Sequence, residues 1–171
     1  MRRFIFVILI LSLIVAVVYS HYPEKSLPVN STIDSIVVDK SNRQLHAYSE
    51  GQLLKSYKVA LGGNPIGDKQ FEGDKKTPEG KYRIDSKNPK SSFHRNLGIS
   101  YPDSLHSIQA VQMGKPAGGD IKIHGIRNGL GLIGRFHRLT DWTNGCIAVT
   151  NSQIEELYNH TKVGTPILIL P

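Results

Sequence analysis

Short apolar runs, each stopped by glycine, proline or polar residues, constrain the fold of this chain more than any other feature. The runs are β-branched or alternate apolar with polar residues, and Glu50-Gly51 supplies a turn between two of them. Residues 85–97 are polar and contain Pro89, so they are predicted to be irregular. The pattern predicts a mainly antiparallel β domain. The runs cover residues 35–39, 43–49, 52–61, 81–84, 121–124, 147–149 and 167–170.

Two short helices are predicted between these runs. Asp103 can cap a helix that ends at Gly114 and has apolar residues at intervals of three. Thr150, with a glutamine three residues later, fits a capping box, which predicts a helix through Tyr158. The apolar positions of the first helix are Leu105, Ile108 and Val111.

The N-terminus carries an export signal. Arg2 and Arg3 precede the unbroken apolar run 4–18, which is the order found in secretory leaders. A cut after Ser20 is one reading, and an uncleaved membrane anchor is the other, because the run is slightly short for a span of about 20 residues. Both readings place the rest of the chain outside the cytoplasm, in the periplasm or on the outer face of the cytoplasmic membrane.

The predicted organisation is a leader or anchor at 1–20, a polar tether at 21–32 and one domain at 33–171. The formal charge is +7, and it becomes +5 once the two arginines of the leader are set aside. This excess suits an anionic partner such as peptidoglycan or lipid headgroups. Export argues against nucleic acid, and a solvated basic surface would have the same composition.

The chain has a single cysteine, Cys146, so no internal disulfide can form. Such a cysteine is a buried filler, an intermolecular partner or a reactive thiol. Gly145 before it allows a close backbone approach, and His124 closes a predicted strand. An adjacent imidazole would lower the thiol pKa from about 8.5 and later protonate a leaving amine. The amides of Gly145 and Cys146 would then bind an oxyanion. Spacing alone makes this pairing a weak signal.

The order of motifs resembles that of the L,D-transpeptidase catalytic-domain family over residues 35–171. The motifs are the cysteine segment 141–149, His124-Gly125, the turn 77–80 and the final Gly-Thr-Pro with its apolar strand. The resemblance implies a β-sandwich-like fold, Cys146 as nucleophile and His124 as base. It also implies that the Gly125 carbonyl orients the base and that Thr143 matches the Ser or Thr three residues before the cysteine.

The family acts on peptidoglycan stem tetrapeptides. It forms a thioester with the diamino acid, releases D-Ala and passes the acyl group to an amine, either on a neighbouring stem or on an envelope lipoprotein. No metal or organic cofactor is implied, because the thioester conserves the energy of the broken bond. Carbapenems acylate members of the family. Two rivals stay open: hydrolysis of the thioester, as in a carboxypeptidase or an amidase that frees wall-linked protein, and a non-catalytic wall-binding module.

Two positions depart from the family pattern. Asn144 stands where a second histidine is common, and Ala148 where an arginine is common. We expect Arg127, Arg135 or Arg138, in the loop 126–142, to replace that charge and bind a stem-peptide carboxylate. A solvated basic loop is the competing interpretation.

The remaining candidates are weaker. Trp142 either lines the donor cleft or plugs the core. Asp141 is expected to cap a turn. A zinc site built from Asp120, His124, His137 and Cys146 matches no compact zinc spacing. The other histidines show no partner pattern and are predicted to lie on the surface; they are His46, His94, His106 and His160.

Overall fold

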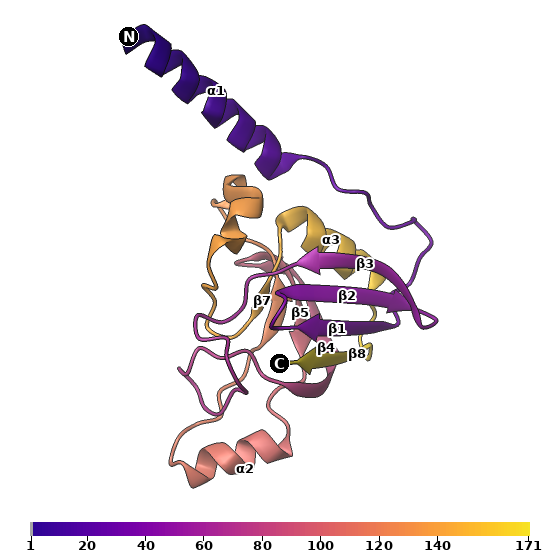
Figure 1. Cartoon of the computed structure of the whole chain (residues 1–171). Coiled ribbons are helices and arrows are strands. Elements are labelled where there is room, and N and C mark those ends of the chain that lie inside the picture. The colour runs from indigo at the N-terminus through magenta and orange to yellow at the C-terminus, as the bar shows by residue number, and fades with distance from the viewer. Residues whose placement is uncertain (1) are drawn as a thin grey trace.

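A computed structural model describes residues 2–171 and contains a curled sheet of eight strands in the order β3-β2-β1-β8-β4-β5-β6-β7 (Figure 1). Most neighbours are antiparallel, while β1–β8 and β6–β7 are parallel. The strands are β1 Ser35–Asp39, β2 Gln44–Ser49, β3 Gln52–Lys58, β4 Gly80–Ser91, β5 His94–Ile99, β6 Lys122–His124, β7 Ile147–Ala148 and β8 Pro166–Leu170.

The long strand β4 curls the sheet. Its first residues pair with β8, with Gly80 opposite Ile169, and from Ile84 onward it pairs with β5. The two parts of the sheet enclose one apolar core, and this confirms the predicted mainly β, sandwich-like fold. The prediction of an irregular segment at 85–97 was wrong, because β4 continues to Ser91 and β5 follows at once. The register shifts near Pro89, which has no N–H to donate to the ladder.

The helix α3, Asn151–His160, forms as the sequence predicts. Thr150 accepts a hydrogen bond from the Gln153 amide, and the Gln153 side chain accepts one from the Thr150 amide. Ile154 and Leu157 are fully buried and pack into the core. The capping box and one apolar face are therefore enough to place this helix against the sheet.

The helix α2, Ser104–Gln112, forms where predicted, and its apolar positions are not the buried ones. All three of its predicted apolar positions are more than half exposed, while His106 and Ala110 are buried. His106 lies between two carboxylates, 2.6 Å from Asp103 and 3.0 Å from Asp68. Its prediction as a surface residue was therefore wrong. Although burial works against the charged imidazole, both carboxylates outweigh it and raise the pKa of His106.

The helix α1, Arg2–His21, projects away from the sheet (Figure 1). Its length and composition allow it to cross a membrane, as a secretory leader also would. The C-terminal end of α1 contacts η1, a 3₁₀ segment at Gly131–Leu139 that is kinked at Gly134. The loop predicted at 126–142 thus contains helical turns.

Candidate functional site

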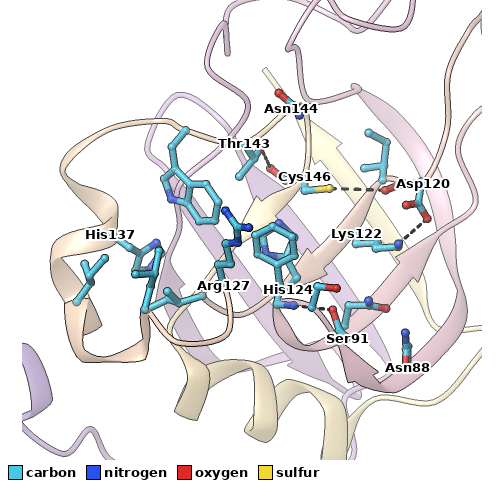
Figure 2. A pocket seen from close by; sticks show the side chains of 18 of the residues that line it. Asn88, Ser91, Asp120, Lys122, His124, Arg127, His137, Thr143, Asn144 and Cys146 are labelled. Carbon is cyan, nitrogen blue, oxygen red and sulfur yellow. Dashed lines mark hydrogen bonds and ion pairs between the residues drawn. The ribbon is translucent and has the colours of Figure 1, made fainter.

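Two parallel strands place the predicted nucleophile and base on one face of the sheet. In the β6–β7 pair, His124 is opposite Ala148, and Cys146 precedes Ala148 by two residues. Since alternate residues of a strand share a face, His124 and Cys146 are diagonal neighbours with Cα atoms roughly 8 Å apart by strand geometry. Both side chains line the same cavity (Figure 2).

The imidazole of His124 is held in one orientation. Its Nδ1 lies 2.7 Å from the Gly125 carbonyl oxygen, so Nδ1 donates and Nε2 is left as the acceptor. A Cβ on Gly125 would lie 2.7 Å from Asn151 Oδ1, so a larger residue here would push against the side chains of α3. Burial lowers the pKa of His124, the Gly125 hydrogen bond opposes this, and the nearby charge of Lys122 lowers the pKa further. The imidazole is therefore neutral at neutral pH.

The thiol of Cys146 is half-buried and donates a weak hydrogen bond to the Asp120 carbonyl oxygen at 3.6 Å. Burial raises its pKa, and the backbone amide and charge of Lys122 only partly offset this. The pKa of Cys146 is thus raised, contrary to the expected lowering by His124. The thiol bonds to a carbonyl, and the imidazole beside it is neutral and supplies no compensating charge.

The turn before Cys146 is built by the buried side chain of Thr143. Its hydroxyl donates to the Cys146 carbonyl at 2.8 Å and accepts from the Gly145 amide at 3.1 Å. The Gly145 amide is consequently occupied in this state, contrary to its predicted availability for an oxyanion. A threonine hydroxyl commonly bonds the amide two residues ahead, and that preference decides the outcome here.

The segments 60–63 and 75–77 pack against the backbone of this turn. Ala60 bridges to Ala148, and Gly62 bridges to Thr143. Gly145 has a φ of +127°, and a Cβ there would lie 2.6 Å from the Lys76 carbonyl oxygen. Glycine is thus required before the cysteine both for its conformation and for the close backbone contact.

The cavity beside Cys146 has a volume of about 990 Å³ and an aromatic wall (Figure 2). The ring of Phe93 lies 4.6 Å from that of His124, and the ring of Trp142 lies 5.7 Å from it. Trp142 is 36% exposed, so of its two predicted roles the structure places it at the cleft. Sequence reasoning missed Phe93, which lies in the segment predicted to be irregular.

His137 is a second histidine that lines the cavity. It is buried against Trp142, with ring centroids 6.4 Å apart, and within residues 2–171 neither of its ring nitrogens has a hydrogen-bond partner. Burial, together with the positive charge of Arg138, lowers the pKa of His137 to about 4.

The predicted substrate arginines separate into two groups. Arg127 lines the cavity, as does Asn144, whereas Arg135 and Arg138 lie outside it and face Glu24 of the N-terminal segment. Their prediction as carboxylate-binding residues therefore gains no support, because an acidic residue of the same chain already occupies them.

Lys122 is a further cavity residue that sequence reasoning missed. It lies two residues before His124 and so shares its strand face, which is a signal that strand periodicity could have supplied. Its ammonium pairs with Asp120 at 2.5 Å. Within residues 2–171, the structure brings no three His, Cys, Asp or Glu side chains together as a metal site, so it does not support the zinc alternative.

Comparisons with known proteins agree with this geometry. YafK of Escherichia coli K12, an L,D-transpeptidase by name, is 28% identical over 129 residues, which are 72% of this chain and 45% of YafK. The helical cell shape determining protein Pgp2 of Campylobacter jejuni superposes with a TM-score of 0.60 at 24% identity, covering 90% of this chain and 52% of Pgp2. Bd1075 of Bdellovibrio bacteriovorus superposes with a TM-score of 0.56 at 27% identity, covering 85% of this chain and 52% of Bd1075.

This chain therefore spans about half the length of each of these relatives. A family model, the L,D-transpeptidase catalytic domain (YkuD), matches residues 33–169, nearly all of the part that follows the leader. The fold and the arrangement of Cys146 and His124 agree with this match. The chain belongs to the L,D-transpeptidase catalytic-domain family.

Proposed function

We propose that this protein is an exported peptidoglycan L,D-transpeptidase that acts through a thioester on Cys146. The observation that carries the proposal is the placement of Cys146 and His124 on one face of the β6–β7 pair, with the imidazole turned by the Gly125 carbonyl so that Nε2 is free to accept a proton. Its substrates are stem tetrapeptides, and it needs no metal or organic cofactor.

In the first half-reaction, Cys146 Sγ attacks the carbonyl carbon of the diamino acid while His124 Nε2 takes the thiol proton. Because the pair is neutral in the free protein, His124 acts as a general base at the moment of attack. The thiol first releases its bond to the Asp120 carbonyl. Collapse of the tetrahedral intermediate breaks the C–N bond, and the imidazolium protonates the departing D-Ala amine.

In the second half-reaction, an amine attacks the thioester, His124 accepts its proton, and the sulfur leaves with the bonding electrons and is reprotonated. The acceptor is the side-chain amine of a neighbouring stem or a lysine of an envelope lipoprotein. The Cys146 amide is the donor that we assign to the oxyanion, since Thr143 holds the Gly145 amide.

We assign Arg127 to a carboxylate of the donor stem, because it is the arginine of the 126–142 loop that lines the cavity. The change Arg127→Ala is expected to raise the KM for the donor several-fold and to leave alkylation of the thiol unchanged. Arg83→Ala is the matched control, since Arg83 lies outside the cavity and donates to the Gly164 carbonyl. Equal KM values for the two variants would contradict the assignment.

Muropeptide analysis tests the activity. Wall material is incubated with the full-length protein and with Cys146→Ala, then digested and separated. New cross-linked dimers that depend on Cys146 support transfer. Shortened monomers or freed wall-linked protein would assign hydrolysis instead.

A carbapenem tests whether the thiol reacts at all. Intact mass is expected to show one adduct on the native protein and none on Cys146→Ser. The absence of an adduct on the native protein, or an equal adduct on both, would favour a non-catalytic wall-binding module.

A further inference from the structure

The end of the apolar helix packs against the catalytic domain. We propose that α1 is retained as a membrane anchor. Its last turn and the tether, residues 19–24, hold η1 in place where it lines the active-site cavity. The structure shows residues 19–24 seated on Gly131–Leu139, close to where α1 leaves the domain (Figure 1). These contacts favour an anchor over a cleaved leader.

Ser20 is buried in the contact between the end of α1 and η1. It is only 5% exposed, whereas the large apolar residues of α1 are between 42% and 71% exposed. Its hydroxyl donates to the Ile133 carbonyl oxygen at 2.9 Å, and the neighbouring Tyr19 ring lies 6.0 Å from the ring of Phe136. A leader destined for removal has no need of a buried polar contact with the folded domain.

Gly134 packs directly against Ser20. It has φ 51° and ψ −130°, outside the helical range, and it is the kink between the two halves of η1. A Cβ at this position would lie 2.2 Å from Ser20 Oγ and 2.7 Å from the Ser20 carbonyl oxygen. The backbones therefore meet at a distance that only glycine permits.

Charged groups continue the contact along the tether. The guanidinium of Arg135 donates to the Tyr19 and Tyr22 carbonyl oxygens, at 3.2 and 2.6 Å, and so caps two groups at the end of α1. Glu24 lies 3.3 Å from Arg135 and 3.7 Å from Arg138, and it accepts from Gln153 of α3 at 2.8 Å. The segment predicted as a free tether is thus fastened to two elements of the domain.

Three residues of η1, Ile133, Phe136 and His137, also line the cavity, as does Leu130 just before the segment. The segment η1 is two short 3₁₀ turns joined by Gly134, whose backbone is not helical, and 3₁₀ turns are usually this short. The kink between the two turns is held by contacts from residues 19–24: Ser20 bonds to Ile133 and packs on Gly134, and Tyr19 contacts Phe136. A cut after Ser20 would remove Tyr19 and Ser20 and leave Gly134 uncovered.

Retention is tested by mass. The full chain with a C-terminal tag is expressed in a Gram-negative host, the membranes are washed with carbonate, and the intact mass is measured. We expect the mass of the uncut chain in the membrane fraction. A soluble protein that begins at His21 would overturn the proposal.

The coupling to η1 is tested by a matched pair of substitutions on one helix. Ser20→Leu places a larger side chain against Gly134, whereas Ser12→Leu makes the same change at an exposed serine that bonds only to Leu9 of its own helix. In detergent, tryptic cleavage after Arg135 and Arg138 is expected to become on the order of tenfold faster in Ser20→Leu and to stay unchanged in Ser12→Leu.

Equal cleavage rates in these two variants would overturn the coupling. If Ser20→Leu fails to fold, Glu24→Gln provides a second test, since it removes the ion pairs to both arginines without adding volume. It is expected to accelerate the same cleavages, and a native rate would count against the seat. Neither mass nor proteolysis requires catalysis, so these tests are independent of the transpeptidase proposal.

Discussion

The change Thr143→Val tests whether the turn before Cys146 depends on one hydroxyl group. Valine keeps the β-branched shape but removes the hydrogen bonds to the Gly145 amide and the Cys146 carbonyl. Each bond contributes about 1 kcal/mol, and an unpaired buried amide costs about 1–3 kcal/mol. We therefore expect a loss of roughly 2–4 kcal/mol in the free energy of unfolding. For a domain of this size that corresponds to a fall in Tm of about 5–15 °C.

Thr143→Ser is the matched control, because it keeps the hydroxyl and loses only a methyl group. Thermal unfolding by circular dichroism gives both midpoints, and intact mass after carbapenem addition gives the acylation rates. We expect the valine variant to have the lower Tm and to be acylated at least about tenfold more slowly, since the freed turn misplaces the thiol. Equal midpoints and equal acylation rates for the two variants would refute the reasoning.

Three further outcomes follow from charged and titratable groups. Because the pKa of His106 is raised in the folded protein, its contribution to stability is complete below pH 6.5 and is lost as pH rises through the folded-state pKa. His106→Gln should therefore lower Tm more at pH 5.5 than at pH 8.5. Equal losses of Tm at the two pH values would contradict this. Alkylation of Cys146 by iodoacetamide should keep accelerating above about pH 8.5, and a plateau near pH 6 would instead indicate a thiolate–imidazolium pair. Lys69 and Asp74 form a buried ion pair at 2.7 Å. Lys69→Met should lower the free energy of unfolding, measured with urea, by about 3–5 kcal/mol, because it leaves a buried carboxylate without its partner. An unchanged urea midpoint would show that this ion pair does not stabilise the fold.

Local features of the sequence were enough to predict much of the fold. A β-branched run predicted β1, alternation of apolar and polar residues predicted β2, and the capping box at Thr150 predicted α3. These patterns act between residues that are close along the chain. The motifs around Cys146 and His124 were sufficient to predict the family. The sequence also indicated the apolar helix, although not whether it is kept.

The tertiary structure decided what depends on distant partners. Pro89 pointed to an irregular segment, but pairing with β5 extended β4 through it. The sequence predicted the helix α2 and a surface position for His106, whereas pairing with two carboxylates buries this side chain. Arg135 could be assigned to a substrate until Glu24, far away in the sequence, was seen to face it.

The thiol pKa shows the same limit. Its direction depends on burial, on the Asp120 carbonyl and on Lys122, none of which the residues beside Cys146 reveal. The sequence by itself was enough to predict most of the strands and to single out Cys146 and His124 as candidates, because those signals lie within a few residues. Only the tertiary structure decided the charge state, the partners and the accessible groups of the site, because electrostatic free energies depend on the surroundings in three dimensions.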